Sequence, residues 1–327
     1  MTRVLLYEYI SGGGCADAQA ACELLPMGRA MRDAIAADLA RVPGVSVTVV
    51  ADASEIRTVS PSGPSHYLSP GASSNAIELV RNEARRHDAV WVIAPETDDV
   101  LAAFCAAVEA SRWIGCDAAS IHIAGSKRRT SRHLAQAGIA TTRAWSPGVP
   151  LRPGPGAWVV KPDDGAGCVD TRFYSDFRAA ECAFQRRAAS GERVTWEEWV
   201  EGDALSLSLL CAQGSAGLLG INRQHIGVTE ERVTYDGVSA GVVGLASPTG
   251  RACASLASRV AHALPGLAGF VGIDVVLHRD RGPVVIEINP RVTCAYPALS
   301  AGQHDNLAAR ILDAHRRGQE PGSRHVA

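Results

Sequence analysis

The chain has 327 residues, of which 46% are apolar and 20% are charged, and its formal net charge is −2. This composition is typical of a folded protein with two or three compact lobes. It excludes a general surface for nucleic acids or anionic membranes, because such surfaces need an excess of basic side chains. Without a run of 18 or more apolar residues or a signal-peptide pattern, we expect a cytoplasmic protein that has no membrane or nucleic-acid partner.

The first 115 residues alternate short apolar strands with helical patterns. Strands are predicted at 3–9, 45–50 and 89–93, and helices at 27–41, 76–87 and 97–111. Strands that alternate with helices predict a parallel sheet covered on both faces. Residues 60–75 are rich in Ser, Pro and Gly, and they predict a surface loop whose role stays open.

After residue 115 the pattern becomes that of two α+β lobes, at 116–194 and 195–327. In the first of these, Ser126 is predicted to N-cap a helix at 127–137 that Gly138 closes. Its strands are predicted at 143–146 and 158–162. The last lobe has predicted strands near 195–200, 205–211, 217–222, 271–278 and 284–289, helices near 252–264 and 304–316, and a frayed tail at 318–327.

Only two of the 32 basic residues are lysines, Lys127 and Lys161. Lysine carries a compact ammonium on a flexible stem, whereas arginine carries a wide planar fork. A narrow phosphate pocket can require the first and reject the second. Two lysines kept in an arginine-rich chain therefore indicate a phosphate site. The nine cysteines occur singly, without a CxxC pair, which favours small buried side chains over a zinc site.

Two apolar runs, 271–277 and 284–288, flank a polar turn and predict a β-hairpin. With a four-residue turn, Asp274 lies opposite Glu287, and Asn289 shares the face of Glu287 because strand residues two apart point the same way. Two adjacent carboxylates and an amide oxygen predict a magnesium site shared with nucleotide phosphates. Arg291 is predicted to hold a transferring phosphoryl group or a developing oxyanion.

Two further segments have features of a nucleotide site. Lys161 ends a strand, and the glycines Gly165 and Gly167 follow in a loop whose backbone N–H groups can approach phosphate oxygens. Later a strand ends in Glu198-Trp199-Val200-Glu201 and turns at Gly202-Asp203. Unpaired backbone groups at such a turn can bind an adenine edge, while Glu201 or Asp203 takes the ribose hydroxyls. The pattern does not decide between these two acids.

Taken in order, these segments resemble the ATP-grasp ligases over residues 1–312. The resemblance implies an α/β protein with the ATP-grasp fold, in which an N-terminal parallel α/β domain precedes two α+β lobes that clamp ATP. It implies that Lys127 and Lys161 contact phosphates and that Glu198 and Val200 bind adenine through backbone atoms. It also implies that two magnesium ions, or manganese, are held by Asp274, Glu287 and Asn289.

The chain departs from this family at two positions. Ala204 stands where many relatives have an acidic ribose ligand, so that Asp203 or Glu201 must serve. Gly272 stands where some peptide-forming relatives have an arginine, and that role then falls to Arg291 or Arg223.

Three other segments are similar to a narrower group, the tyramine–glutamate ligases of methanofuran biosynthesis and their methylotroph counterparts. They are YEYISGGG at 7–14, IAPE at 93–96 and GINRQ at 220–224. The similarity implies that ATP phosphorylates a glutamate carboxylate and that tyramine or a tyrosine-like amine attacks the acyl phosphate. The family resemblance is compatible with a homodimer, but the sequence does not fix the oligomeric state, because no segment shows a clear interface. Substrates bind at the carboxyl ends of parallel strands. This nominates Glu8, Ser11, Gly12, Gly13 and Glu96, and the third-lobe strand adds Asn222 and Arg223.

Three alternatives stay open. Another ATP-grasp amino-acid or dipeptide ligase would use the same ATP residues. A non-catalytic ATP-binding regulatory protein is disfavoured because the lysines, the metal triad and Arg291 are all present. A dehydrogenase that uses NAD is disfavoured because Gly12-Gly13-Gly14 lacks the GxGxxG spacing. The sequence does not specify which glutamate carboxylate reacts.

Overall fold

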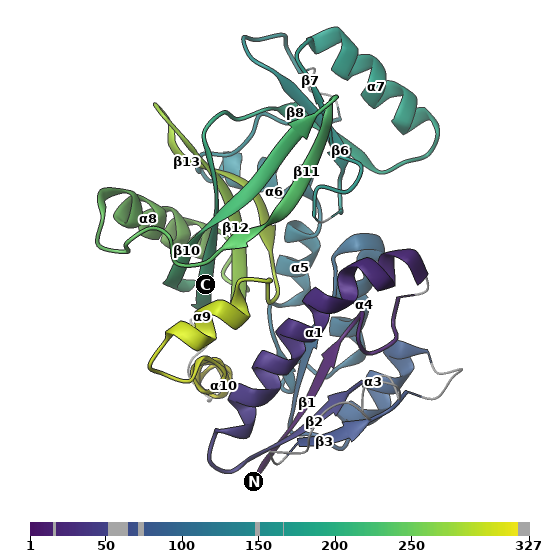
Figure 1. Ribbon diagram of the computed structural model, residues 1–327, viewed down its shortest axis with the longest axis vertical. Helices are drawn as coiled ribbons and strands as arrows, with labels where there is room; N and C mark the ends of the chain where they lie inside the picture. The colour runs from purple at the N-terminus through teal and green to yellow at the C-terminus, as the bar shows by residue number, and fades with distance from the viewer. Residues whose placement is uncertain (16–17, 52–64, 71–74, 148–150, 166, 320–327) are drawn as a thin grey trace.

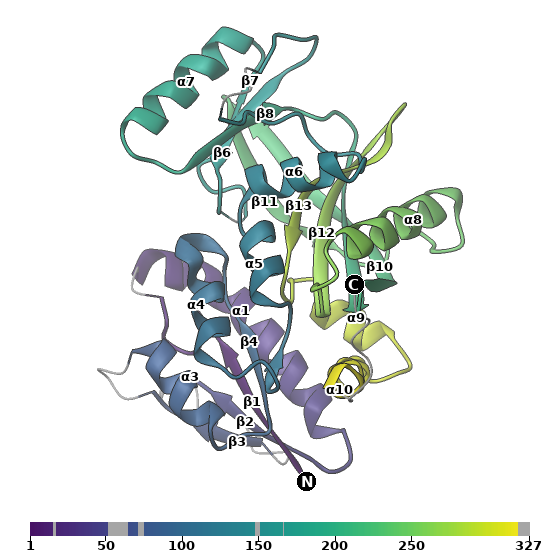
Figure 2. The same cartoon turned by 180° about the vertical axis from the view of Figure 1, so that it is seen from behind.

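The computed structural model describes residues 1–15, 18–51, 65–70, 75–147, 151–165 and 167–319. The chain forms two sheets, a five-stranded parallel sheet and an eight-stranded antiparallel sheet (Figure 1). The parallel sheet and its helices lie at one end of the molecule, and β6 to β8 with helix α7 lie at the other (Figure 2). No helix in the described ranges is both long and apolar enough to span a membrane.

The parallel sheet has the strand order β3-β2-β1-β4-β5. Its strands are β1 Thr2–Glu8, β2 Val45–Val50, β3 Ser65–Leu68, β4 Ala89–Ile93 and β5 Trp113–Ile114. The helical segments that accompany it are α1 Ala18–Ala40, α3 Ala76–Ala84, the 3₁₀ helix η1 Thr97–Asp99, α4 Val100–Ala107 and α5 Ala118–Ala124. The predicted parallel α/β arrangement is therefore confirmed.

Side chains on β1 alternate between the two faces of this sheet, as strand geometry requires. Tyr7 packs against Phe104 of α4 on one face, with the ring centroids 5.1 Å apart. Leu6 belongs to the cluster on the other face, together with Ile35 of α1. Because both faces are covered, the carboxyl ends of β1 and β4 are the places where this sheet can offer polar groups.

Three predictions in this part need correction. Residues 65–68 of the predicted 60–75 loop form β3, which pairs with β2 at the sheet edge, where a polar strand is tolerated. Residues 60–64 and 71–74 of that loop lie outside the described residues. Helix α1 starts at Ala18 and contains Pro26, although proline is more common in the first turn of a helix. Helix α4 ends at Ala107 and does not reach 111.

The antiparallel sheet has the strand order β13-β12-β9-β10-β11-β7-β6-β8. Its strands are β6 Trp158–Pro162, β7 Arg172–Tyr174, β8 Val194–Glu198, β9 Asp203–Ala212, β10 Ser215–Thr229, β11 Arg232–Ser239, β12 Gly269–His278 and β13 Gly282–Asn289. The helices are α6 Lys127–Gln136, α7 Phe177–Ala189, α8 Pro248–Ala263, α9 Tyr296–Gly302 and α10 Leu307–Gln319.

This sheet has two parts, β13-β12-β9-β10-β11 and β7-β6-β8. The two parts are joined at the pair of Arg172 on β7 with Arg232 on β11. Strand β8 pairs with β6, so we propose that the second lobe continues through β8 and does not end at residue 194. The strand predicted at 143–146 is reduced to isolated bridges, one of which joins Ala144 to Glu197. Strands β7 and β11 and helices α5, α7 and α9 were not predicted.

The C-terminal helices join the third lobe to the parallel sheet. Buried side chains of α9 and α10 share a cluster with α1. Asp38 of α1 accepts hydrogen bonds from Tyr296 Oη (2.8 Å) and Ser300 Oγ (2.6 Å). The third lobe is thereby held against the face of the first sheet that α1 covers. Residues 320–327 of the predicted tail lie outside the described residues.

Candidate active site

A cleft of about 690 Å³ lies where the three parts of the chain meet. Strands β6, β8, β9, β12 and β13 form most of its wall, and residues of α1 and of the ends of β1 and β4 form its inner end. The predicted site residues that border it are Glu8, Lys127, Lys161, Gly165, Gly167, Glu198, Trp199, Val200, Asp203, Asp274, Glu287, Asn289 and Arg291. Segments that are more than 250 residues apart in sequence therefore line one space.

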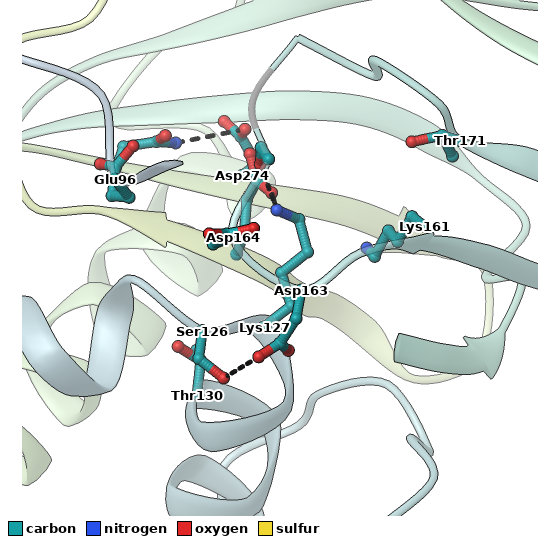
Figure 3. A network of polar contacts seen from close by, with 12 residues as sticks. Glu96, Ser126, Lys127, Thr130, Lys161, Asp163, Asp164, Thr171 and Asp274 are labelled. Carbon is teal, nitrogen blue, oxygen red and sulfur yellow. Dashed lines mark hydrogen bonds and ion pairs between the residues drawn. The ribbon is translucent and has the colours of Figure 1, made fainter. Parts of the chain in front are cut away.

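Lys127 is the first residue of α6, and Asp163 fixes the position of this helix start. Ser126 N-caps the helix, as predicted, by accepting a hydrogen bond from the backbone N–H of Arg129. Its hydroxyl also donates to Asp163 Oδ2 (2.6 Å), and Asp163 Oδ1 accepts from the backbone N–H of Arg128 (2.9 Å). Lys127 then reaches from the helix toward the hairpin strands (Figure 3), where its Nζ donates to Gly165 O and lies 3.2 Å from Glu287 Oε2.

Lys161 lies on β6 and forms an ion pair with Glu197 of the adjacent strand β8. The side chains of the lysine and the glutamate are only 8% and 1% exposed. Glu197 also accepts a hydrogen bond from Thr142 Oγ1 (2.7 Å). Burial lowers the pKa of Lys161, but Glu197 and Glu287 outweigh burial and raise it above the ordinary value. The ammonium is therefore charged at neutral pH and fixed in place.

Asp274 and Glu287 are directly opposite on the hairpin of β12 and β13, as predicted. The turn is one residue shorter than predicted, since His278 pairs with Gly282. A bulge between Val285 and Glu287 adds the missing residue and restores the predicted pairing.

The electrostatics of this carboxylate pair are asymmetric. Burial, followed by the charge of Glu287, raises the pKa of Asp274 to about 7. Burial would also raise the pKa of Glu287, but the ammonium groups of Lys127 and Lys161 hold it below the ordinary value. Two carboxylates that repel each other in this way are suited to a cation between them.

The residues at this hairpin fit a magnesium ion through their two carboxylates. Asn289 donates from Nδ2 to Asp274 Oδ2 (3.3 Å), so that its amide nitrogen, and not its oxygen, faces the pair. Asn289 could therefore serve as a ligand only after its amide turns. Among the described residues, no group of three or more His, Cys, Asp or Glu side chains gathers as at a metal site. A metal here would rest on Asp274, Glu287 and non-protein oxygens.

Arg291 follows β13 and is paired with Glu96, which follows β4 of the parallel sheet. Glu96 Oε2 accepts from Arg291 Nη2 (2.9 Å) and Nε (3.2 Å). The arginine and glutamate side chains are 14% and 8% exposed. This contact joins two segments that are 195 residues apart, and it fixes the guanidinium at the inner end of the cleft.

The turn between β8 and β9 closes the other end of the cleft. The N–H groups of Glu198 and Trp199 are paired with backbone carbonyls of Arg143 and Ala157, so the prediction that they are unpaired is wrong for these two groups. The Glu198 carboxylate is held by Arg143 and Arg281. At Gly202 a Cβ would lie 2.3 Å from Leu277 O, and φ is +147°, so the turn requires glycine.

Among the predicted substrate-binding residues, Glu8 borders the inner end of the cleft. It is 3% exposed and accepts from the backbone N–H groups of Ser11 (2.7 Å) and Ile10 (3.2 Å). Burial raises the pKa of this carboxyl despite these hydrogen bonds. Gly28 of α1 packs against it so closely that a Cβ would lie 2.5 Å from Oε2.

Several predicted site residues do not border the cleft. They are Ser11, Gly12, Gly13, Glu96, Glu201, Asn222 and Arg223. Asn222 is fully buried and donates to Ser206 O and Ser208 Oγ of the neighbouring strand, so it has no group to offer a substrate. Arg223 is 47% exposed and pairs with Asp203 (3.1 Å) at the rim.

The remaining residues in this set lie behind the cleft wall or outside it. Ser11 is 1% exposed, and Gly12 and Gly13 form the turn that follows β1. Glu201 is exposed to solvent. Glu96 reaches the site only through Arg291. Ala166, between the two loop glycines, lies outside the described residues.

The sequence prediction missed four polar residues at the site. Asp163 and Glu197 position the two lysines, and the signals that could have found them are KPDD and the alternating TWEE. Tyr235 borders the cleft from β11, and its hydroxyl lies 3.1 Å from Cys294 Sγ. Neither Tyr235 nor Cys294 has a local sequence signal, since β11 itself was not predicted.

Comparisons with known proteins bear on this arrangement. A sequence model of the ATP-grasp domain matches residues 124–295, which is more than half of the chain. A model of the pre ATP-grasp 3 domain matches residues 45–121. The boundary between the two matches falls just before Lys127.

Two curated relatives are both named tyramine–L-glutamate ligase. The protein from Methanocaldococcus jannaschii is 29% identical over 208 residues, which are 63% of this chain and 56% of the relative. The protein from Methanocaldococcus fervens is 27% identical over 218 residues, which are 66% of this chain and 62% of the relative. The match therefore spans less than two thirds of each relative.

Solved structures share the fold over almost the whole chain. An ATP-grasp superfamily protein from Archaeoglobus fulgidus is 19% identical, with a TM-score of 0.69 over 96% of this chain and 88% of that protein. A D-alanine–D-alanine ligase from Bacillus anthracis, complexed with ATP, is 16% identical, with a TM-score of 0.62 over 97% of this chain and 98% of that protein. At these identities the likeness shows the fold alone.

Proposed function

The chain belongs to the ATP-grasp family, and from this membership we propose that it is an ATP-dependent ligase that activates a carboxylate and joins it to an amine. One observation carries the proposal. Both lysines of the chain border a single cleft, and Asp274 and Glu287 border the same cleft from the hairpin. Ammonium groups beside a carboxylate pair suit a phosphate chain that is held by the lysines and by a metal ion.

We propose that ATP lies along the cleft, with its adenine at the β8–β9 turn and its phosphates at the two lysines. Adenine lies against the β8–β9 turn at Trp199 and Val200, and Asp203, at the rim, takes the ribose. The phosphates lie between Lys127 and Lys161, where the loop glycines Gly165 and Gly167 border the cleft. The support for this direction is that the lysines and the turn all border the cleft, and that β6, which carries Lys161, pairs with β8, which leads into the turn.

A magnesium ion, or manganese, would be held by Asp274 and Glu287, with Asn289 beside them. When bound, the metal supplies positive charge that offsets the phosphate oxygens during transfer. Lys127 contacts Glu287 here, so the lysine and the carboxylate pair stand close enough to act on the same phosphate group. The number of ions is left as a question for metal titration.

The proposed reaction has two steps. A carboxylate oxygen of the substrate attacks the γ-phosphorus of ATP, and ADP leaves with the electron pair of the broken P–O bond. The amine nitrogen then attacks the carbonyl carbon of the acyl phosphate, and phosphate leaves as the C–N bond forms. Arg291, fixed by Glu96, is positioned to hold the phosphoryl group and then the tetrahedral oxyanion.

The inner end of the cleft is assigned to the acid and amine substrates. Apolar side chains of α1, including Met27 and Met31, border it together with Glu8. Such a wall accepts an apolar or aromatic amine and limits water, which would otherwise hydrolyse the acyl phosphate.

We propose glutamate as the acid, and tyramine or a tyrosine-like amine as the partner, in the biosynthesis of a methanofuran-type one-carbon cofactor. The support is the two relatives named tyramine–L-glutamate ligase, which match over about two thirds of this chain. A second candidate is an amino-acid ligase of other specificity. It is favoured by the fold shared with an L-amino acid ligase from Bacillus licheniformis, 17% identical with a TM-score of 0.64.

The test is ATP-dependent phosphate release with magnesium, glutamate and a panel of amines led by tyramine and tyrosine, with the products identified by mass spectrometry. We expect a γ-glutamyl amide together with ADP and phosphate. Lys161→Ala and Asp274→Ala should abolish product formation, whereas the exposed surface variants Arg81→Ala and Asp313→Ala should leave it unchanged.

The outcomes separate the candidates. Turnover with other acids or amines, but not with glutamate and tyramine, would keep the ligase and replace its substrates. Tight nucleotide binding without turnover on any pair would contradict the proposal and favour a regulatory protein.

A further inference from the structure

A polar contact outside the cleft joins the second lobe to the first lobe, which contains the parallel sheet. Asp164, which follows β6, accepts a hydrogen bond at Oδ2 from the backbone N–H of Asp98 (3.0 Å). Its backbone carbonyl accepts from Thr97 Oγ1 (3.3 Å). Arg193, which precedes β8, pairs with Asp164 and also with Asp98 and Asp99. The two lobes therefore meet at Asp164, whose side chain is only 13% exposed.

The η1 side of this contact has an unusual backbone. Asp98 and Asp99 have φ angles of +53° and +57°, in the left-handed region that residues other than glycine rarely adopt. Such conformations persist where surrounding contacts hold them. At Asp98 the N–H group bonds to Asp164 and the carboxylate pairs with Arg193. The contact is therefore a defined arrangement and not a chance meeting of two exposed surfaces.

On the second lobe, the contact is adjacent to the residues that position Lys127. Asp163 precedes Asp164, bonds to the cap residue of α6 (Figure 3), and accepts the backbone N–H of Lys127 (2.8 Å) at its carbonyl. Gly165 follows Asp164 and accepts from Lys127 Nζ. A shift of Asp164 would therefore move the ammonium group that is assigned to the ATP phosphates.

On the first lobe, the contact is adjacent to the residue that positions Arg291. Glu96 directly precedes Thr97 and pairs with Arg291 (2.9 Å). The Glu96 carbonyl also accepts from the backbone N–H of Asp99 (3.1 Å), so residues 96–99 form one tight turn. The contact therefore sets how the Arg291 guanidinium and the Lys127 ammonium lie relative to each other.

We propose that Asp164 is a positioning residue, whose contact with residues 97–99 and Arg193 is a latch that holds the second lobe closed over the bound nucleotide. The effect on the reaction rests on the proposed function. ATP phosphates that bind Lys127 fix the loop at Gly165, and the loop brings Asp164 to Asp98. The closed lobe keeps water out until the amine attacks. When the latch is broken, water attacks the acyl phosphate and returns the free acid and phosphate.

The first experiment measures how much phosphate is released for each amide bond formed. Wild type should release about one phosphate for each amide, as the proposed reaction requires. Asp164→Ala removes the acceptor for Asp98 and Arg193. We expect it to release about three to ten phosphates for each amide, because its closed state is less populated. Asp164→Asn keeps an acceptor oxygen without the charge, and its ratio should lie between the other two.

Asp88→Ala is the matched control. Asp88 accepts from the backbone N–H of Arg3 (2.9 Å) and pairs with its guanidinium (2.9 Å), as Asp164 does with its own partners, but within the first lobe. This variant should keep the wild-type ratio. Salt gives a second signature. From about 0.05 to about 0.5 M salt, the wild-type ratio should rise, because Arg193 is half-exposed and its charge is screened, whereas the ratio of Asp164→Ala should stay constant.

Hydrogen exchange follows the latch without catalysis. The backbone N–H of Asp98 is protected by Asp164. AMP-PNP, an ATP analogue that is not hydrolysed, should with magnesium slow exchange in the peptide 96–101 of wild type. The same addition should not slow exchange in this peptide of Asp164→Ala.

Each outcome decides the inference. A raised ratio in Asp164→Ala, together with nucleotide-dependent protection of 96–101 in wild type, supports the latch. A loss of amide at an unchanged ratio would overturn it and show that Asp164 only shapes the phosphate loop. Equal exchange with and without nucleotide would also overturn it. If wild type makes no amide from any pair of substrates, the proposed function fails, while the exchange result still supports or overturns the latch.

Discussion

Two groups of ion pairs hold the second lobe in place, and they differ in how much water reaches them. Inside the cleft, the side chains of the Lys161–Glu197 pair are 8% and 1% exposed. On the outer side of the same lobe, Arg193 is 52% exposed, and it pairs with Asp98 (84% exposed), Asp99 (63% exposed) and the more buried Asp164.

Neither group adds much stability, but only the inner group carries a desolvation cost that needs an explanation. Exposed pairs cost little to form and contribute little, because water competes for both charges. A buried pair must be desolvated, and well-packed apolar residues in its place are often equally stable. A buried lysine retained in a chain that has only two lysines therefore points to a ligand that needs its charge.

The largest expected effect follows from removing one partner of the inner pair. Lys161→Met leaves Glu197 buried without a cation, and Glu197→Gln leaves Lys161 buried without its ion-pair partner, although the charge of Glu287 still acts on it. Each single variant should lower the free energy of unfolding by about 3–5 kcal/mol, measured by urea denaturation, because an uncompensated charge stays in the interior.

The double variant Lys161→Met/Glu197→Gln separates stability from function. It should recover most of the lost stability, since neither charge remains, yet it should form no product. Recovery of activity together with stability would contradict the assignment of Lys161 to ATP.

For the carboxylate pair on the hairpin, we expect removal of one charge to raise the free energy of unfolding and not to lower it. Asp274→Asn removes the repulsion from Glu287, so without metal, in EDTA, it should raise the free energy of unfolding at pH 8 by about 1–2 kcal/mol while it abolishes activity. The folded-state pKa of Asp274 is about 7, against an ordinary value of 3.8. The contribution of Asp274 to wild-type stability therefore rises as pH falls from 7 to 4, and the variant lacks this contribution.

The advantage of Asp274→Asn should accordingly be complete above pH 7 and absent below pH 4. Thermal unfolding across this range would check the sign, with Asp313→Asn, an exposed aspartate on α10, as the control. A variant that is less stable than wild type at pH 8 would show that Asp274 is not repelled by its neighbour.

The hairpin shows how far the sequence could predict this site. Alternation placed Asp274 opposite Glu287, and the structure confirms the pairing. The prediction assumed a four-residue turn, whereas the turn is shorter and a bulge before Glu287 compensates. Turn length and bulges depend on backbone geometry that apolar periodicity does not encode. The pairing was therefore right, although the turn was wrong.

Residues that act by contact between distant segments were harder to predict. Lys127 and Lys161 stood out by composition, but Glu197 and Asp163, which position them, belong to ordinary local patterns. Asn222 was nominated from its strand, yet its amide is bonded within the sheet. In each case the deciding fact is which strand lies alongside, and this is set by the tertiary fold.

The smallest expected effect belongs to the outer group, and it tests whether exposure decides the difference. Arg193→Gln removes the cation that joins Asp98 and Asp99 of η1 to Asp164, which follows β6. Because water and salt screen these charges, the free energy of unfolding should change by no more than about 1 kcal/mol. The change should shrink further in about 0.5 M salt, where the Debye length is only a few ångströms. Urea denaturation at low and high salt measures both quantities. A loss as large as that of Lys161→Met, or one insensitive to salt, would mean that exposure does not set how much an ion pair contributes in this lobe. The Lys161–Glu197 ion pair would then be explained by stability alone, without a ligand that needs the charge of Lys161.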